Sequence, residues 1–179
     1  MARIHRSKGR RGAELLEFTL ALLPLLMMIF LLLDACWGMF VKSTLAFAVH
    51  AGLRLGITIT GTQATTMGAD LTSIVKAEVQ RNAMGLLAGA SGLAKIKVNY
   101  LQPPGSGSTA AAVDVSAQNN GNAPLNIMQV SVQGFALGAL MPRMFGLHTS
   151  VDNAATVINA IAADLIEPSR DVPPIGAAP

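Results

Sequence analysis

An uncharged apolar run near the N-terminus constrains this chain more than any other feature. Residues 18–33 read FTLALLPLLMMIFLLL and carry no charged side chain between Glu17 and Asp34. These 16 residues are fewer than the roughly 20 that cross a bilayer as a helix. Apolar residues continue through 35–41, however, so a helix from about Ala13 to Val41 could span with some tilt or with snorkelling at its ends. The sequence predicts one transmembrane helix.

The basic residues are concentrated ahead of this run. Five of the thirteen Lys and Arg residues lie in the first eleven positions, which leaves eight basic against ten acidic residues elsewhere. By the positive-inside rule, this asymmetry places the N-terminus in the cytoplasm and the rest of the chain across the membrane. A nucleic-acid partner would need a basic patch on the folded part. The charge distribution therefore predicts membrane lipid as a partner and no nucleic acid.

The helical pattern continues beyond the membrane, to about residue 60. Apolar residues recur at three- and four-residue steps through ACWGMFVKSTLAFAVHAGLRLG (35–56), and small residues on this stretch permit close helix packing. TITGTQATTMG (58–68) predicts a break in the helix. Asp70–Leu87 then predicts a second, amphipathic helix, with Asp70 in the first turn, where a negative charge suits the helix dipole.

The remainder changes to a period of two, which indicates strands. The predicted strands are 95–101 (KIKVNYL), 112–117 (AVDVSA), 127–137 (IMQVSVQGFAL) and 149–159 (TSVDNAATVIN), the last with a helix as an open alternative. We therefore expect an α+β chain: a long N-terminal transmembrane helix extending into a small domain with a second helix and a three- to four-stranded antiparallel sheet. The expected divisions are a basic leader (1–12), the long helix (13–60), the extracytoplasmic domain (61–167) and a disordered proline-rich tail (168–179).

No arrangement of residues in the sequence indicates catalysis. The three histidines are scattered, and no HExxH, CxxC or GxSxG pattern occurs. GSGSTA (105–110) fits a relaxed dinucleotide fingerprint, but a strand-like segment follows it where a helix is required, so a loop is favoured. We expect no enzyme, no catalytic residue, no metal and no cofactor. The single cysteine, Cys36, allows no intrachain disulfide; it is either a small apolar helix residue or, in LDAC (33–36), a lipidated cysteine.

Glu17 is the residue whose position is physically demanding. An ionised carboxylate close to the hydrocarbon costs several kcal/mol. Glu14 lies beside the basic border and can reach the head groups, whereas Glu17 is one helical turn deeper. In one interpretation the membrane helix starts later, and Glu17 lies at the interface facing Arg10 or Arg11. In the other, the carboxylate has a partner inside the membrane.

The surrounding residues resemble a type IV prepilin processing site. RRGAELLEF (10–18) carries a basic leader, then a glycine, a glutamate five residues on, and a long apolar helix. The resemblance implies that a prepilin peptidase cuts between Gly12 and Ala13 on the cytoplasmic face. It also implies that Glu17 becomes the fifth residue of the mature chain and pairs with an N-terminal amine of its own or a neighbouring subunit. Such a pair is tolerable where each charge alone is costly, and it fixes the register between subunits.

Further features are similar to those of the TadE-like family of minor pilins. The pair Glu17-Phe18 is similar to that of the Flp/Tad branch, and Pro24 interrupts the apolar helix before Asp34, as in TadE-like openings. AFAVHAGLRLG (46–56) and VSVQGFALGALMPRMFG (130–146) resemble later segments of the family. The resemblance implies a minor pilin of a Tad (type IVc) pilus that acts in assembly and surface adhesion. Its implied partners are prepilin peptidase, other pilin subunits and the Tad assembly platform.

The implied location is the bacterial inner membrane, single-pass, with the domain in the periplasm and possible incorporation into an extracellular pilus. Glu17 and Phe18 would form the assembly contact, and Pro24 would kink the helix by removing one backbone hydrogen bond. Two alternatives remain open from the sequence. One is a type II secretion pseudopilin, which uses the same processing; the other is a signal-anchored periplasmic membrane protein or lipoprotein unrelated to pili.

Overall fold

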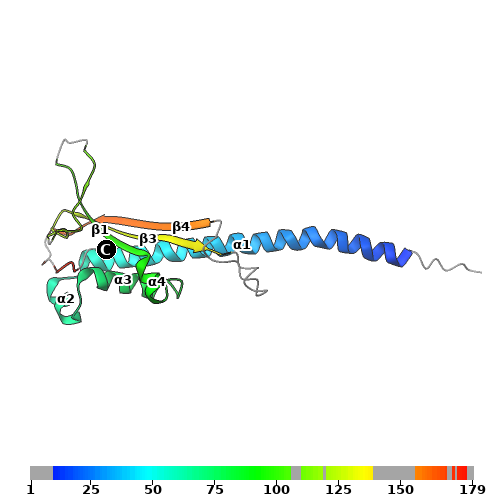
Figure 1. The fold of residues 1–179 in the computed structure, drawn as a ribbon, viewed down its shortest axis with the longest axis horizontal. Coiled ribbons are helices and arrows are strands. Elements are labelled where there is room, and N and C mark those ends of the chain that lie inside the picture. Colours follow the sequence, from blue (N-terminus) through cyan, green and yellow to red (C-terminus); the bar gives the residue numbers. More distant parts are fainter. Residues whose placement is uncertain are drawn as a thin grey trace, which may run out of the picture.

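The computed structural model describes residues 10–105, 110–118, 120–138, 156–168, 171 and 173–176, with side chains from Ala13 onwards. A single long helix projects from a small domain that contains all the other elements (Figure 1). In chain order, the elements are α1 (Arg10–Thr58), α2 (Gly61–Met67), α3 (Leu71–Asn82), α4 (Gly89–Ala94), β1 (Ile96–Gln102), β2 (Val113–Asp114), β3 (Ile127–Leu137) and β4 (Thr156–Leu165).

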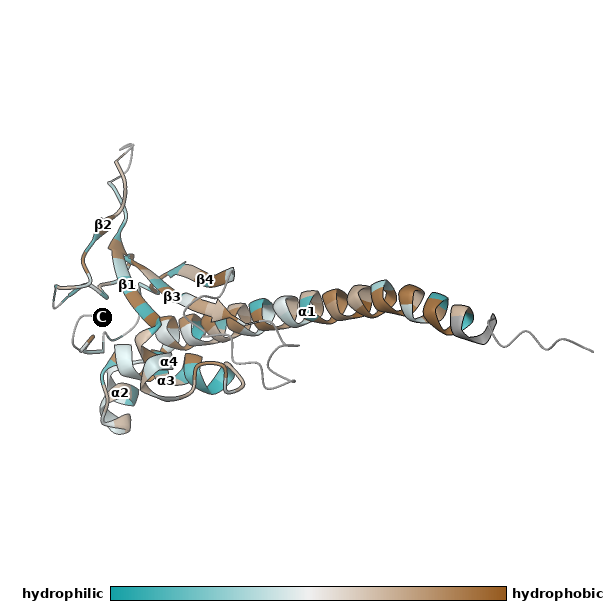
Figure 2. Cartoon of the chain, turned by 45° about the vertical axis from the view of Figure 1, so that its right-hand side comes forward, coloured by the Kyte–Doolittle hydropathy of each residue, from teal (hydrophilic) through white to brown (hydrophobic). Residues whose placement is uncertain are grey.

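Only the C-terminal half of helix α1 packs within the domain. Its 49 residues correspond to a length of about 74 Å at the rise of an α-helix. The helix continues through Pro24 without a break, because neighbouring turns can hold the backbone where one amide hydrogen is missing. The N-terminal half extends free of the domain and is predominantly hydrophobic (Figure 2). The C-terminal half is part of the core.

The four strands form one antiparallel sheet in the order β2-β1-β3-β4. The central strand β3 pairs with β1 from Ile96↔Val132 to Leu101↔Ile127, and with β4 on its other side. A register shift after Val132 in the β3–β4 pair accommodates Gly134, whose φ of +68° suits a residue without Cβ. The predicted α+β architecture is confirmed, with a sheet of four strands.

The core lies between this sheet and two helices on one of its faces. Helix α1 packs against β3, β4 and α3, and α3 also contacts β1. Alternate residues of β1 (Ile96, Val98 and Tyr100) are buried together with residues of α1 and α3. The fully buried aliphatic side chains of the two helices are Val41, Leu45, Val49, Leu71, Val75 and Val79. This alternation along strands and three- to four-residue spacing along helices is the pattern that the sequence predicts.

Two glycines set the distance between the helices and the sheet. A Cβ atom added to Gly52 would lie 2.4 Å from Cγ2 of Val79, and one added to Gly56 would lie 2.5 Å from Sδ of Met128. The C-terminal half of α1 therefore approaches α3 and the sheet more closely than any larger residue would allow. The small residues predicted to permit close packing within 35–56 serve this purpose at Ala48 and Gly52, which are buried.

The structure differs from the sequence-based expectation at several local points. The predicted break at 58–68 contains α2, which begins with a capping box: Thr60 Oγ1 accepts from the amide of Gln63, and Gln63 Oε1 accepts from the amide of Thr60. Asp70 is the N-cap of α3 rather than a residue of its first turn. Strand β4 begins at Thr156, so only the end of the predicted 149–159 strand falls in it; residues 149–155, like the proline-containing segment 141–146, lie outside the described residues.

The segment expected to be a disordered tail is packed where the structure describes it. The carbonyl oxygens of Asp171, Pro174 and Ile175 accept hydrogen bonds from the amides of Gly61, Leu71 and Thr72, respectively. These three amides belong to the first turns of α2 and α3, where helices lack intrahelical acceptors. Ile175 is also buried. Proline-rich composition suggested disorder, but the tail supplies hydrogen-bond acceptors that two helix N-termini require.

Candidate functional site: the exposed apolar half of α1

The free half of α1 exposes large apolar side chains on every face. The large apolar residues from Leu15 to Leu33 that are exposed have exposed fractions between 39% at Leu26 and 73% at Met28. None of the most apolar 18-residue window of this helix is buried against the rest of the chain. A water-soluble surface does not carry a continuous apolar band of this kind. This half of α1 therefore requires lipid or other protein chains around it.

The length of the free segment matches a bilayer. The first fully buried residue of α1 is Val41, so about 42 Å of helix precede it from Ala13. A bilayer is about 30 Å thick across its hydrocarbon core and about 40–45 Å thick with its head-group regions. Among the described residues, α1 is the one helix that is long and apolar enough to cross a membrane.

The residues singled out by the prepilin resemblance lie at the start of this helix. Gly12 and Ala13 are in the first turns of α1, and the side chains of Ala13, Glu17 and Phe18 are exposed. Positions four apart share one face of a helix, so Ala13 and Glu17 lie on the same side, about 6 Å apart along the axis. The basic residues 1–9 lie outside the described residues, so their predicted role as a leader is not addressed by the structure.

The peptide bond between Gly12 and Ala13 is helical in this structure. A protease needs an extended substrate, so the first turn would have to open. This opening is inexpensive, because the first amides of a helix have no intrahelical acceptor to lose and glycine is about 1 kcal/mol less favourable than alanine in a helix. The location of Gly12 in a terminal turn is thus compatible with cleavage there.

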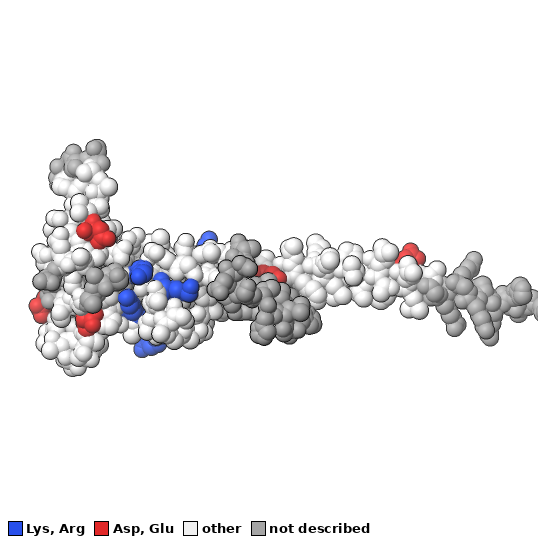
Figure 3. Space-filling model, in the orientation of Figure 1, with Lys and Arg blue, Asp and Glu red and all other residues white. Residues whose placement is uncertain are grey.

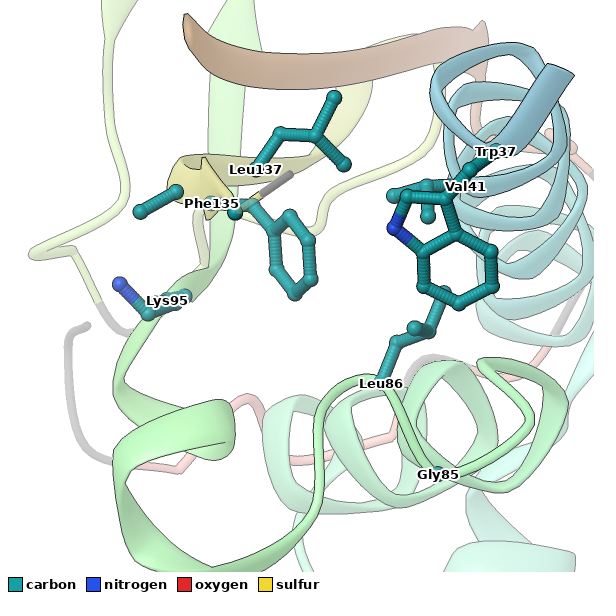
Figure 4. A pocket seen from close by; sticks show the side chains of 9 residues that line it. Trp37, Val41, Gly85, Leu86, Lys95, Phe135 and Leu137 are labelled. Carbon is teal, nitrogen blue, oxygen red and sulfur yellow. The ribbon is translucent and has the colours of Figure 1, made fainter. Parts of the chain in front are cut away.

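A second feature lies where α1 enters the domain, and the sequence did not indicate it. A cavity of about 350 Å³ is lined by Trp37 and Val41 of α1, the loop after α3, and the end of β3. Figure 4 shows Trp37, Leu86 and Phe135 around this space. The Trp37 ring also stacks on Phe40, with 5.6 Å between ring centroids.

This cavity offers packing rather than chemistry. Among the described residues that line it, Lys95 is the charged one, and its Nζ donates a 2.7 Å hydrogen bond to the carbonyl oxygen of Gly134. Within the described part of the chain, no three His, Cys, Asp or Glu side chains are placed to hold a metal ion. The lining comes from segments nearly 100 residues apart in the sequence, which is why no local pattern revealed it. The aromatic pair at Trp37 and Phe40 was the available signal.

Charges on the described surface are distributed unevenly. In the view of Figure 3, Lys and Arg atoms gather on the folded domain, whereas Asp and Glu atoms lie at its far end and along α1. Burial raises the pKa of Asp70, but hydrogen bonds from the Ser73 side chain and amide outweigh it and hold the pKa below its usual value. The side chain and amide of Ser116 likewise lower the pKa of Asp114. Both carboxylates order turns, and neither faces a cavity described above.

The arrangement of one exposed apolar helix and one folded domain is consistent with a single-pass membrane anchor. Residues 12–54 match the family model described as TadE-like protein, which confirms the resemblance seen in the sequence. This segment covers the apolar span and the part of α1 that is buried in the domain, and it indicates a Tad pilus-associated protein that interacts with other pilus components. No curated protein matches the chain. No solved structure matches it either.

Proposed function

We propose that this chain is a TadE-like minor pilin of a Tad (type IVc) pilus, which acts in pilus assembly and, as a result, in surface adhesion. The observation that carries this proposal is an overlap. The TadE-like match over residues 12–54 includes the apolar half of α1 that the domain leaves exposed, and it begins at the glycine of the predicted processing site. Glu17 follows one turn later, in the position that a prepilin-type assembly contact requires.

Processing by prepilin peptidase between Gly12 and Ala13 would create a new amine at the start of the exposed helix. That amine and the Glu17 carboxylate lie on one face of α1, about 6 Å apart along its axis. Two opposite charges in a low-dielectric region are far less costly as a pair than alone. The pair can form within one chain or between adjacent subunits, and a subunit displaced along the bundle would leave both charges unmatched. Phe18, exposed beside Glu17, would pack against the neighbouring helix.

The chain would insert with its N-terminus in the cytoplasm and its α+β domain in the periplasm. It would remain in the inner membrane until the assembly platform draws it into or onto the pilus, with other pilin subunits around α1. Pro24 removes one backbone hydrogen bond inside the span, which would loosen the helix for bending during this transfer. The role is one of assembly and interaction, without catalysis and without a cofactor.

The decisive test is the intact mass of the full-length chain purified from cells with and without prepilin peptidase. We expect loss of residues 1–12 only when the peptidase is present. Gly12→Val should abolish the cleavage while membrane insertion persists, because only the small residue at the cut site changes. Gly38→Ala is the matched control, a glycine of the same helix outside the site, and should be cleaved normally.

Three results would overturn the proposal. An unprocessed chain in both cell types would indicate a plain signal anchor. Cleavage ahead of Cys36 with the added mass of a lipid would indicate a lipoprotein. Correct processing combined with normal pilus assembly in a deletion strain, together with a loss of type II secretion, would indicate a pseudopilin.

A further inference from the structure

Within the described part of the chain, strand β4 presents a long edge without a partner strand. It is the outermost strand of the sheet, and no described strand pairs with its outer side (Figure 1). Residues 156–163 (TVINAIAA) contain no charged residue and no proline. Edges of this kind invite pairing with another chain, and proteins usually protect them with lysine, proline or a very short strand. The opposite edge, β2, is protected in that way: it has two residues.

The hydrogen-bond pattern identifies which backbone groups face outwards. At the end of β4, the amide of Ile166 donates to the carbonyl oxygen of Asn126, next to β3, at 2.8 Å. On the other side of β3, the amide of Gln133 donates to the carbonyl oxygen of Lys95, next to β1, at 2.9 Å. Because successive residues of an antiparallel strand bond to alternate sides, the even-numbered residues of β4, like Ile166, bond to β3. The outward-facing groups therefore belong to Val157, Asn159, Ile161, Ala163 and Leu165, and the amide of Leu165 already donates to Asp164 Oδ1 at 2.8 Å. The side chains of this same set are all exposed.

A groove beside this edge could accommodate the side chains of an added strand. A cavity of about 390 Å³ lies where α1 passes the far end of β4, lined by His50, Leu53, Arg54, Ile57, Thr58 and Asp164. Leu53 and Ile57 are apolar residues of this lining, and the exposed side chains of Arg54 and Asp164 give it one charge of each sign. An apolar side chain followed by an amide side chain, which can accept from Arg54 and donate to Asp164, would suit this lining.

The direction of β4 relative to α1 limits which chain can pair with it. Thr156 pairs with Leu137, whose Cδ2 would lie 3.3 Å from a Cβ at Gly38. At the other end, Asp164 shares a cavity with Arg54. The strand from Thr156 to Asp164 and the helix from Gly38 to Arg54 are both about 24–27 Å long. Strand β4 therefore runs alongside α1 and in the same direction, away from the membrane.

Two copies of this chain therefore cannot pair through β4. If α1 spans the membrane as in the proposed function, on which this step rests, all copies insert with α1 parallel, and their β4 strands are parallel too. When a two-fold axis runs along two identical parallel strands, it places the same backbone group of each strand at the same height. Amides then face amides, so no ladder of hydrogen bonds can form between the strands.

We propose that the outer edge of β4 binds an extended segment of a different protein chain, which adds to the sheet as an antiparallel fifth strand. This segment runs towards the membrane and places alternate side chains over the groove, with an Asn or Gln side chain near Arg54 and Asp164. Main-chain hydrogen bonds to Asn159, Ile161 and Ala163 supply the affinity, and the groove supplies the specificity.

Amide hydrogen exchange on the full-length chain tests this proposal, with the chain purified in detergent compared with the chain in membranes of pilus-assembling cells. In the assembly, we expect the amides of Val157, Asn159, Ile161 and Ala163 to exchange at least tenfold more slowly than in detergent. Ala163→Pro removes an outward-facing amide and should cancel this slowing at the other three. Proline is tolerated on an edge strand where its nitrogen faces away from the sheet.

Controls separate docking from misfolding. In Ala163→Pro, the amides of Val130 and Val132 in β3 should exchange as slowly as they do in the parent chain in detergent. If they exchange faster, Ile161→Lys, which keeps every backbone hydrogen bond, is used in place of Ala163→Pro and should also cancel the slowing. Lys97→Gln, on β1 away from the edge, should leave the slowing intact.

Equal exchange of the edge amides in detergent and in assembling membranes would overturn the proposal. So would edge protection in the purified chain alone, since a second copy or the chain itself would then cover β4. Loss of protection in Lys97→Gln would assign the contact to the open sheet face instead. The exchange measurement is independent of the mass measurement. An uncut chain with a protected β4 edge would refute the processing site and leave the strand docking intact. A cut chain with an unprotected β4 edge would refute the strand docking and leave the processing site intact.

Discussion

Replacing Gly52 by alanine is expected to destabilise the domain, although alanine favours helices. The added methyl group would lie 2.4 Å from Cγ2 of Val79 and 3.3 Å from the carbonyl oxygen of Val75. Carbon atoms pack at about 3.5–4.0 Å, so α1 and α3 would have to separate by about 1 Å, or Val79 would have to leave its rotamer. Val79 is fully buried and β-branched, which restricts that rotation.

The net effect follows from two opposing terms. Overpacking of a close-packed core costs about 1–3 kcal/mol, and the rigidity of Val79 places Gly52→Ala in the upper half of this range. The gain in helix propensity is about 1 kcal/mol. We therefore expect a net loss of about 1–2 kcal/mol in the free energy of unfolding. At Gly38 the nearest atom to an added Cβ is Leu137 Cδ2 at 3.3 Å, the end of a flexible side chain, so Gly38→Ala should be neutral or stabilising.

Urea denaturation in detergent micelles, followed by the fluorescence of Trp37, measures both variants. Trp37 is the single tryptophan of the chain, and it lines the cavity between α1 and the domain, so its emission should change when the domain separates from the helix. The midpoint should fall for Gly52→Ala and not for Gly38→Ala, with the slope unchanged. A Gly52→Ala variant as stable as the parent chain would refute the argument that glycine sets the α1–α3 distance.

Three further outcomes follow from the same structure. Glu17→Gln should insert normally but impair pilus assembly, as seen by electron microscopy of the cells; unaltered pilus number would count against the pairing role. The pKa of Asp70 is lowered in the folded state. The stabilisation by its carboxylate is therefore present above the unfolded pKa of about 4 and is lost as the pH falls through the lower folded pKa. Asp70→Asn should reduce the loss of stability below about pH 4, as measured by denaturation curves over a pH series. Ile175→Ala should lower the free energy of unfolding by about 2–4 kcal/mol, whereas a tail that contributes nothing would leave it unchanged.

Local patterns in the sequence specified much of the architecture. The charge-free run at residues 18–33, the apolar residues that continue it through 35–41 and the basic residues before it predicted a membrane-spanning start, because a helix over this whole stretch is long enough to cross a bilayer. The strand pattern in 127–137 predicted β3 with the bounds observed. The glycine and glutamate at Gly12 and Glu17 gave the family resemblance. Each of these signals lies within a few helical turns or one strand, so no knowledge of distant contacts was required.

What the sequence could not supply depends on segments that meet only in the fold. Residues 171 and 173–176 have no core-forming pattern of their own, and they are ordered because two helix N-termini need their carbonyl oxygens. The cavity at Trp37 combines residues from α1 and the end of β3. The open edge of β4 exists because strand order places β4 outermost, and strand order is a property of the sheet rather than of any strand. Short-range periodicity therefore determined the elements, whereas long-range pairing decided which surfaces remained free to bind.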